Sequence, residues 1–319
     1  MVKPATSPWR LAILSRDCKT YARLLTPLLP DCVSIRWCSD QPADIQTPQV
    51  QLMLGDPDLL VQVINDCHNV AWAQSTWAGN APLLRAPKRD YQLTGVKGIF
   101  GQQMREYVFA YLLYFARNIA GFKQAQDAGE NKWQAPEYNA LAGQTLGIAG
   151  AGHIASSVAS AAKVFGMQVI GLNRSGNASN EYDAVFTPHQ KLDFARRCDY
   201  VVSLLPDTPA THKFIDAPFL AAMPEHSVLI NAGRGVVIDD DALIAALTQA
   251  HIRAAVLDVF IEEPLPDTHP YWTLPNTYVT QHTAAISKES DVAMVFHDNL
   301  QRWLNDTPLN YVFDFDKGY

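Results

Sequence analysis

The sequence lacks the long apolar runs, paired cysteines and excess of basic residues that mark several large classes of protein. No apolar stretch approaches the roughly 18–20 residues of a membrane-spanning helix, and residues 1–10 lack the apolar core of a signal peptide. The five cysteines are an odd number without close pair spacing, so we expect reduced thiols in a cytoplasmic protein and no metal site. A formal net charge of −7 argues against a general nucleic-acid-binding surface.

What remains is the composition of an ordinary globular protein. Hydrophobic residues make up 48% and charged residues 18% of the 319 residues, which suits two domains that each bury a core. Short apolar segments alternate with helical patterns, which predicts a parallel sheet covered by helices on both faces. In the first part of the chain we expect strands at residues 9–15, 34–38, 50–54 and 70–74, and a helix over residues 57–67.

The longest helical pattern covers residues 101–128, where apolar and aromatic side chains recur at near-helical spacing. We expect one helix there, leading from the first domain to the second, with its aromatic residues used for packing or subunit contact. Beyond it, buried strands are expected at residues 200–205, 227–231 and 254–259, and a last long helix at residues 287–304.

A glycine turn between two apolar segments organises the second domain. An apolar run at residues 146–149 leads into the pattern Gly-x-Gly-x-x-Ala, which starts at Gly150, and a small-residue helix then leads to a second apolar run at residues 167–172. Gly150 permits the tight turn, Gly152 lets the backbone approach a pyrophosphate, and the helix N-terminus offers free N–H groups to that anion. The glycine pattern alone would fit any tight turn, but this order of elements is typical of a dinucleotide-binding domain.

The end of the second apolar run indicates which dinucleotide binds. An NAD site usually has an Asp or Glu here, about 20 residues past the glycines, to bind the ribose 2′-OH. This sequence has Asn173, Arg174 and Ser175 instead. A carboxylate would repel a 2′-phosphate, whereas Arg174 can pair with it and Ser175 can donate a hydrogen bond. The motif favours NADP(H) over NAD(H); the alternative is that Arg174 is a solvated surface side chain.

Three polar segments follow predicted strands of the second domain. They contain Arg234 between two glycines, Glu263, and His282. Singly, each residue has an equally good structural interpretation, but beside a dinucleotide turn they are the groups that reduction of a 2-oxo acid requires. Arg234 can bind carboxylate and carbonyl oxygens, His282 can deliver the proton as hydride arrives, and Glu263 can orient the imidazole and favour its protonated form.

A loop of the first domain is a candidate substrate site. Residues 75–80 follow the last strand predicted there, at its carboxyl end, where ligands of open α/β sheets bind. A Ser-Thr run beside glycine has free N–H groups suited to a carboxylate, although the tryptophan in it can equally be a packing residue. We therefore expect substrate contacts at Thr76, Trp77, Ala78 and Gly79.

Four motifs occur in a highly specific order: Gly-x-Gly-x-x-Ala, Asn-Ala-Gly-Arg-Gly, Leu-Asp-Val-Phe-x-x-Glu-Pro-Leu-Pro and Thr-x-His-x-Ala-Ala. In this order they resemble the D-isomer-specific 2-hydroxyacid dehydrogenases, over nearly the whole chain. Residues 102–107 and residues 317–319 look most like the glyoxylate/hydroxypyruvate reductase A branch, which prefers NADPH. The resemblance implies Arg234, Glu263 and His282 as the catalytic residues, and a homodimer formed through the cofactor domain.

The resemblance also implies a fold and a set of contacts. The fold is expected to be α/β with two doubly wound parallel-sheet domains, and the active site in the cleft between them. A Rossmann cofactor domain at residues 96–287 would be inserted into a flavodoxin-like substrate domain at residues 1–95 plus 288–319. Cofactor contacts are expected at Gly150, Gly152, His153, Ile154, Asn173, Arg174, Ser175, Leu205, Pro206, Ala232 and Asp258, the last at the nicotinamide carboxamide.

Two departures from the family pattern leave the substrate range open. Gln281 stands where most members have Pro, and Asn80 stands where Val is usual. The leading interpretation is an NADPH-dependent reductase of glyoxylate, hydroxypyruvate or a related 2-oxo acid, with no nucleic-acid or membrane partner. The alternatives are an NAD-dependent dehydrogenase of another 2-hydroxy acid, such as D-lactate, and a non-enzymatic cofactor-sensing protein like the corepressors of this fold.

Overall fold

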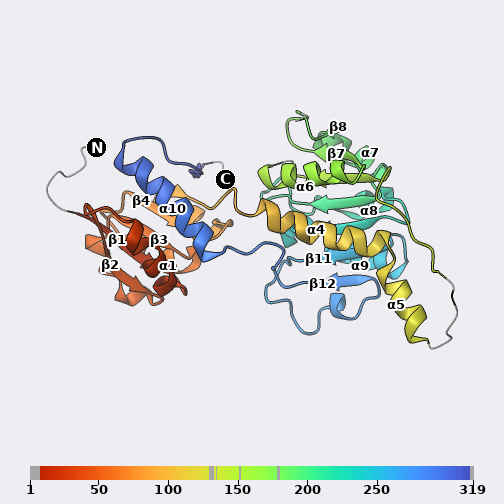
Figure 1. The fold of residues 1–319 in the computed structure, drawn as a ribbon, viewed down its shortest axis with the longest axis horizontal. Helices are drawn as coiled ribbons and strands as arrows, with labels where there is room; N and C mark the ends of the chain where they lie inside the picture. Colours follow the sequence, from red (N-terminus) through yellow and green to blue (C-terminus); the bar gives the residue numbers. More distant parts are fainter. Residues whose placement is uncertain (1–7, 129–132, 134, 151, 178–179, 317–319) are drawn as a thin grey trace. The chain divides into compact units, whose positions relative to one another are not determined.

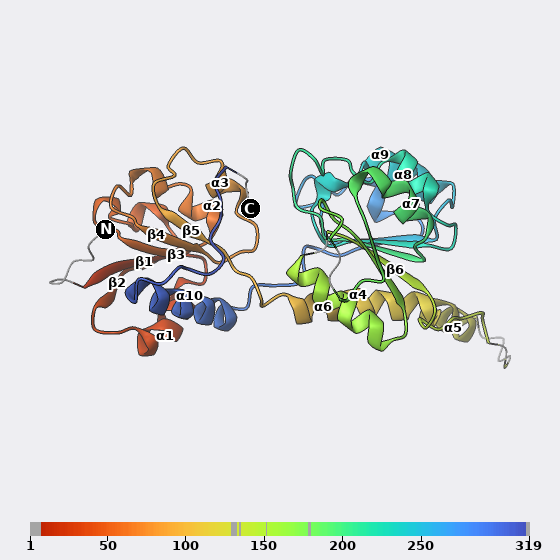
Figure 2. The ribbon, with the colours of Figure 1, turned by 90° about the horizontal axis from the view of Figure 1, so that it is seen from above.

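The computed structural model describes residues 8–128, 133, 135–150, 152–177 and 180–316. The chain divides into two compact units, Met1–Ile99 with Ser287–Tyr319, and Phe100–Ile286. Each unit contains one parallel sheet between layers of helices (Figures 1 and 2). Among the described residues, none of the helices combines the length and the apolarity needed to cross a membrane.

The first unit contains a five-stranded sheet in the order β2-β1-β3-β4-β5. Its strands are β1 (Trp9–Leu14), β2 (Val33–Ser39), β3 (Leu52–Gly55), β4 (Trp72–Ser75) and β5 (Gln92–Thr94). Helices α1 (Cys18–Leu25) and α10 (Glu289–Leu304) cover one face, and α2 (Pro57–Leu60) and α3 (Ala81–Leu84) cover the other (Figure 2). This is the flavodoxin-like strand order, so the predicted fold class is confirmed for this unit.

Helix α10 completes the first unit although it comes from the far end of the chain. Its Phe296 stacks on Trp72 of β4, with ring centroids 4.9 Å apart, and both side chains are fully buried. Asn299, also buried, donates a hydrogen bond to the side-chain oxygen of Gln74 at 3.1 Å. Truncating one such buried ring typically costs about 3–5 kcal/mol, so α10 is an integral part of this core.

The second unit contains a seven-stranded sheet in the order β12-β11-β10-β9-β6-β7-β8. Its strands are β6 (Thr145–Ala149), β7 (Gln168–Leu172), β8 (Ala184–Phe186), β9 (Tyr200–Ser203), β10 (Val228–Asn231), β11 (Ala254–Leu257) and β12 (Thr277–Val279). This is the Rossmann order with one strand added at an edge, which confirms the predicted class. The strand order reverses between β6 and β9, and ligands of such sheets bind at this switch point.

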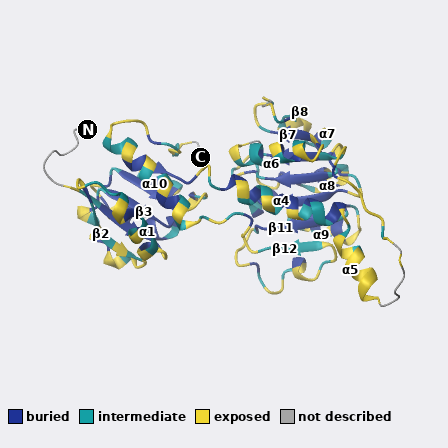
Figure 3. Ribbon diagram, viewed as in Figure 1, coloured by how far each residue is buried: buried dark blue, intermediate teal, exposed yellow. Residues whose placement is uncertain are grey.

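Helices cover both faces of the second sheet (Figure 2). On one face lie α4 (Gly101–Ala116) and α6 (His153–Val164), while α5 (Ile119–Asp127) extends beyond the sheet. On the other lie α7 (Lys191–Arg196), α8 (Ala217–Ala222) and α9 (Asp240–Thr248). The central strands are buried on both sides (Figure 3), which is why they appear in the sequence as continuous apolar runs.

The helix expected over residues 101–128 is interrupted. Helix α4 ends at Ala116 and α5 begins at Ile119, because Asn118 between them adopts a left-handed conformation with a φ of 49°. Asparagine is among the few residues that adopt this conformation readily. Its side-chain oxygen accepts the N–H of Gly121 at 3.2 Å, so Asn118 ends one helix and caps the next.

Other errors of the sequence-based prediction concern short elements. The helix expected over residues 57–67 is wrong: only Pro57–Leu60 is α-helical, and a 3₁₀ turn follows at Ile64–Asp66. Strands β5 and β8 were not predicted at all. Each is three residues long and forms an edge of its sheet, so neither offers enough sequence for a periodic signal.

Candidate active site

The glycine turn joins β6 to α6 at the switch point of the seven-stranded sheet. Gly150 has a φ of 96°, and a Cβ there would lie 2.8 Å from the carbonyl carbon and oxygen of Leu204. A side chain is therefore excluded twice, by backbone conformation and by the close approach of the loop after β9. A Cβ on Gly152 would meet no described atom within 4 Å, so packing within the protein does not require glycine there. The space at Gly152 is open to a ligand, directly before the first turn of α6.

The loop after β7 is organised by Asn173, one of the residues predicted to bind the cofactor. Its Oδ1 accepts the N–H groups of Ser175 at 3.0 Å and Gly176 at 2.7 Å, and its Nδ2 donates to the carbonyl of Asn177 at 2.9 Å. This shaping of the loop is a role that the sequence reasoning missed. Arg174 is exposed, and no hydrogen bond or ion pair joins it to another residue that the structure describes. Its guanidinium is therefore available to an anion.

The other predicted cofactor residues lie at the same edge of the sheet. His153 and Ile154 form the start of α6, and Leu205 and Pro206 follow β9. Ala232 follows β10, and its N–H donates to the carbonyl at the end of β9 at 3.1 Å. The loops after β6, β9 and β10 are thus brought into contact at the carboxyl ends of their strands.

The Asn-Ala-Gly-Arg-Gly segment forms a tight loop after β10. Asn231, fully buried, donates from Nδ2 to the carbonyl of Arg234 at 3.1 Å, and Nη1 of Arg234 donates to the carbonyl of Gly233 at 2.6 Å. Burial lowers the pKa of the Arg234 guanidinium, while the nearby carboxylates of Glu263 and Asp207 act in the opposite direction. The arginine is therefore partly desolvated, held by its own loop, and close to Glu263.

Glu263 connects the loop after β11 to the histidine after β12. Its Oε1 accepts the N–H of Phe260 at 2.9 Å, and its Oε2 lies 2.8 Å from Nδ1 of His282. A Cβ on Gly235 would lie 2.0 Å from the carbonyl carbon of Phe260. The loop that carries Arg234 is therefore in direct contact with the loop that carries Glu263. With Nδ1 bound to the carboxylate, Nε2 on the opposite side of the imidazole is left to act on a substrate. The His282 side chain is 53% exposed, as such a role requires.

The backbone at His282 has a conformation that few residues adopt, with a φ of 56°. Its N–H donates to the carbonyl of Asp258 at 2.8 Å, and the carboxylate of Asp258 accepts the N–H groups of Thr283 at 2.8 Å and Ala284 at 3.0 Å. Asp258 is only 1% exposed. Beside the predicted contact with the cofactor, Asp258 therefore has a role that the sequence reasoning missed: it holds the turn that carries the histidine.

In the first unit, the candidate substrate loop is held by Asp56, the residue after β3. Asp56 is 4% exposed, and its carboxylate accepts hydrogen bonds from the hydroxyls of Ser15 at 2.9 Å and Thr76 at 2.6 Å. It also accepts the N–H of Arg16 at 3.0 Å. The sequence reasoning missed Asp56, although a polar residue directly after an apolar strand was the signal that identified the other site residues.

The N–H groups of the substrate loop are only partly free. Thr76 donates its N–H to the carbonyl at the end of β3 at 2.9 Å, and Trp77 donates its N–H to the hydroxyl of Ser75 at 3.1 Å. The expectation of free N–H groups is therefore wrong for these two residues. The N–H groups of Ala78 and Gly79 form no hydrogen bond within the described part of the chain. Trp77 is 40% exposed, and the guanidinium of Arg16 lies over its ring, 5.8 Å from the ring centroid.

The two departures from the family pattern have different surroundings. Asn80 is 3% exposed, and its Nδ2 donates to the carbonyl of Trp77 at 3.4 Å, so its side chain helps to hold the substrate loop. Gln281 is exposed beside His282. The chain end that contributed to the predicted branch, residues 317–319, lies outside the described residues.

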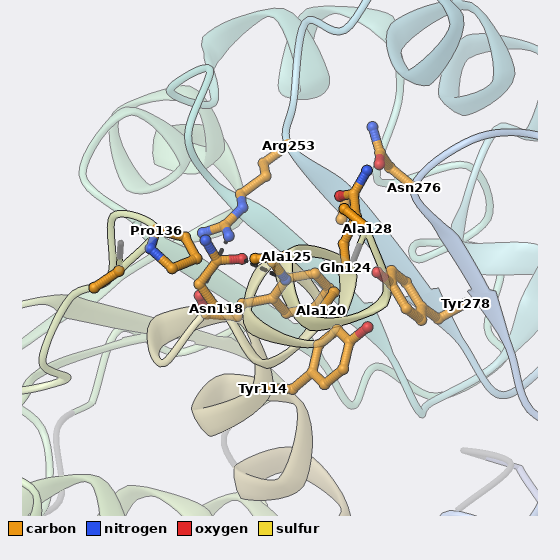
Figure 4. A pocket seen from close by; sticks show the side chains of 14 residues that line it. Tyr114, Asn118, Ala120, Gln124, Ala125, Ala128, Pro136, Arg253, Asn276 and Tyr278 are labelled. Atoms are coloured by element: carbon orange, nitrogen blue, oxygen red, sulfur yellow. Dashed lines mark hydrogen bonds between the residues drawn. The ribbon is translucent and has the colours of Figure 1, made fainter. Parts of the chain in front are cut away.

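A cavity of about 670 Å³ lies elsewhere in the second unit, between α5 and the start of strands β11 and β12. Figure 4 shows Asn118, Gln124, Arg253 and Tyr278 around it. Arg253 donates to the carbonyl of Phe115 at 3.2 Å. None of the predicted catalytic, cofactor or substrate residues lines this cavity.

Comparisons with known proteins point to one family. Residues 109–284 match the model described as D-isomer specific 2-hydroxyacid dehydrogenase, NAD binding domain. A glyoxylate/hydroxypyruvate reductase A from Photorhabdus laumondii is 33% identical over 220 residues, which is 69% of this chain and 69% of that protein.

Solved structures are similar over almost the whole chain. A D-isomer specific 2-hydroxyacid dehydrogenase family protein from Aeromonas salmonicida is 36% identical, with a TM-score of 0.89 over 97% of this chain and 100% of that one. A D-isomer specific 2-hydroxyacid dehydrogenase from Xanthobacter autotrophicus, solved with NADPH and MES, is 26% identical, with a TM-score of 0.86 over 98% of this chain and 100% of that one.

Proposed function

The chain belongs to the D-isomer-specific 2-hydroxyacid dehydrogenases, an NAD(P)-dependent enzyme family, and from this premise we propose that it is an NADPH-dependent reductase. Its proposed substrate is a small 2-oxo acid of the glyoxylate or hydroxypyruvate type. The observation that carries the proposal is the pair of His282 and Glu263, with Nδ1 and Oε2 2.8 Å apart at the carboxyl edge of a Rossmann sheet. Such a pair orients an imidazole for proton delivery.

The residues of the glycine turn fit a dinucleotide. The space at Gly152 is open, and the N–H groups in the first turn of α6 have no helical partner, so both suit a diphosphate. Arg174 and Ser175 are exposed at the end of β7, where they would meet a 2′-phosphate. NADPH, when bound, supplies the hydride for the substrate carbonyl. The NADPH in the Xanthobacter relative supports the same choice of cofactor over NAD(H).

The chain's own groups supply binding and the proton. Arg234 would bind the substrate carboxylate and carbonyl oxygen, and its partly desolvated guanidinium strengthens that interaction. Nε2 of His282 would donate its proton to the carbonyl oxygen, while Nδ1 stays on Glu263. The N–H groups of Ala78 and Gly79 are proposed to bind the substrate carboxylate. In this scheme residues 1–95 with 288–319 bind the substrate, and residues 96–287 bind the cofactor.

The direct test is a substrate panel. NADPH oxidation is followed with glyoxylate, hydroxypyruvate and pyruvate, and the reverse reaction is followed with D-lactate and NAD. We expect the highest kcat/KM with NADPH and glyoxylate or hydroxypyruvate. Turnover of D-lactate with NAD at a higher kcat/KM would contradict the proposal, as would cofactor binding without turnover of any 2-oxo acid.

Cofactor choice is expected to depend on Arg174. A charge-assisted hydrogen bond contributes about 1.5–3 kcal/mol, so Arg174→Ala should weaken NADPH binding about tenfold to over a hundredfold and leave NADH binding unchanged. The Kd of each nucleotide can be measured by fluorescence titration. Arg196→Ala is a matched control, because Arg196 is an exposed arginine of the same unit that pairs with Asp193. A wild-type enzyme that bound both nucleotides equally would refute the assignment.

We also propose a homodimer formed through the second unit. Exposed apolar side chains gather at α5: Ile119 is 51%, Phe122 42% and Tyr138 50% exposed. The rings of Phe122 and Tyr138 lie 6.1 Å apart, and the cavity of Figure 4 adjoins the same helix, which is largely exposed in Figure 3. Exposed apolar surface of this kind marks protein–protein contacts.

A charge placed on this surface is expected to separate the dimer. Phe122→Glu would bury an unpaired carboxylate in the interface, which costs several kcal/mol, so the variant should be a monomer at micromolar concentration. Light scattering after size-exclusion chromatography measures the mass. Met294→Glu is the control, since Met294 is 56% exposed on α10 of the other unit. A dimeric Phe122→Glu variant would exclude α5 from the interface.

The thiols support the proposed cytoplasmic location. All five cysteines are free. Burial raises the pKa of the Cys67 thiol to about 11, so this thiol stays protonated and unreactive at neutral pH. Free thiols are typical of a reducing compartment.

A further inference from the structure

Helix α4 contacts the segment that carries His282 through two side chains one turn apart. Nε2 of Gln103 donates to the carbonyl of Ile286 at 2.9 Å, and Oε1 of Gln103 accepts the N–H of Ile286 at 3.1 Å. Tyr107 follows four residues later, on the same face of the helix, and its hydroxyl lies 2.9 Å from Oγ1 of Thr280. The helix therefore holds this segment on both sides of His282.

The hydrogen bond between Tyr107 and Thr280 has a defined direction. The hydroxyl of Thr280 donates to Oδ1 of Asp258 at 2.5 Å. A threonine hydroxyl has only one proton, so toward Tyr107 it must accept, and the phenol must be the donor. Burial raises the pKa of Tyr107, which keeps this proton on the phenol at neutral pH. The bonds thus run from Tyr107 to Thr280 and from Thr280 to Asp258.

Asp258 connects these bonds to the histidine. Its carboxylate also accepts the N–H groups of Thr283 and Ala284, and its carbonyl accepts the N–H of His282. A carboxylate that is 1% exposed depends on such donors, because water cannot replace them. The left-handed backbone of His282 persists only because the surrounding bonds determine it. If the carboxylate of Asp258 loses one of these donors, its position becomes less fixed. The turn that orients the imidazole of His282 then becomes less fixed as well.

We propose that Tyr107 is a positioning residue for His282, acting through Thr280 and Asp258, and that Gln103 fixes the far end of the same segment. The inference rests on the proposed function, in which His282 donates the proton. Gln103 and Tyr107 both belong to residues 102–107, which resemble one branch of the family, and their contacts give a physical reason for these two side chains.

The test compares two phenols on one helix. Tyr107→Phe removes the donor and keeps the ring. Tyr111→Phe is the matched control: its ring lies 5.2 Å from that of Tyr107, but its hydroxyl makes no hydrogen bond with any described residue. We expect Tyr107→Phe to lower kcat for 2-oxo acid reduction about three- to tenfold, with the KM of the 2-oxo acid unchanged, and Tyr111→Phe to behave as wild type.

Variants of Thr280 test the path itself. Thr280→Val should lower kcat at least as much as Tyr107→Phe, and Thr280→Ser, which keeps the hydroxyl, should restore it. The double variant Tyr107→Phe with Thr280→Val should have a kcat no lower than that of Thr280→Val alone. Both changes break the same series of hydrogen bonds, which runs from Tyr107 through Thr280 to Asp258. If the double variant lost kcat by the product of the two single losses, the proposal would be overturned.

Hydrogen exchange provides a readout that needs no substrate. The N–H groups of Thr283 and Ala284, both bonded to Asp258, should exchange faster in Tyr107→Phe and not in Tyr111→Phe. Unchanged exchange, or a lower melting temperature with normal kcat per folded molecule, would overturn the positioning role. If wild type reduced no 2-oxo acid while exchange still accelerated, the proposed function would fail and the role of Tyr107 in holding the turn would stand.

Discussion

Replacing His282 with asparagine is expected to lower kcat for 2-oxo acid reduction by about a hundredfold or more. General acid catalysis contributes about 10²–10⁴ to such rates, and asparagine cannot deliver a proton at neutral pH. Asparagine is chosen because it tolerates the left-handed φ of 56° at this position, so the turn around Asp258 should keep its shape. Single-turnover measurements with saturating NADPH would separate the chemical step from product release.

Two controls accompany this variant. The melting temperature of His282→Asn should stay close to that of wild type, because the backbone bonds to Asp258 are retained. Glu263→Gln keeps an oxygen that can accept from Nδ1 but carries no charge, so its turnover should lie between those of wild type and His282→Asn. Near-normal turnover in His282→Asn would remove the histidine from the proposed mechanism.

The second large effect is expected from Arg234→Lys. Lysine keeps the charge but loses the planar fork that binds two oxygens at once. Loss of one donor to a developing oxyanion typically costs about 10²–10³ in rate, so kcat/KM for 2-oxo acids should fall by that amount. The Kd of NADPH, measured by titration without substrate, should change little.

Arg253→Lys is the matched control for this substitution. Like Arg234, Arg253 is partly buried in the second unit and donates to a backbone carbonyl, but it lines the cavity beside α5. Its replacement should leave kcat/KM unchanged. Equal losses in both variants would indicate a general effect on the fold, and wild-type turnover in Arg234→Lys would assign the carboxylate to other groups.

The sequence predicts best those parts of the structure whose signal is local. The strands on either side of the glycine turn are buried on both faces, so they form apolar runs that can be recognised without the fold. Arg234 and Glu263 lie in the loops after two such strands, β10 and β11. His282 follows β12, a partly buried edge strand, and was identified from its chemistry together with the other two residues. The break at Asn118 could not, because a single residue in a left-handed conformation ends a helix whose apolar spacing continues.

Bonds between distant parts of the chain carry no local signal. Asp56 bonds to Ser15, 41 residues away, and Tyr107 bonds to Thr280, 173 residues away. The spacing of these residues in the sequence does not indicate that they are in contact, because only the packing of the strands and helices brings them together. The sequence therefore reveals the groups that can do chemistry, but not the groups that hold them in place.

Helix α10 packs on β4 but is synthesised last, and this determines the order in which the chain can fold during synthesis. Trp72 and Gln74 leave the ribosome early, but Phe296 and Asn299, which pack on them, are translated only after the whole second unit. The second unit is continuous in sequence, so its core can close while the part of the first sheet that α10 covers is still exposed beside α1. In a nascent chain that paused before residue 289, Trp72 and Gln74 would lack the cover of α10 and would be accessible to chaperones, and the unit made first would be the last to mature.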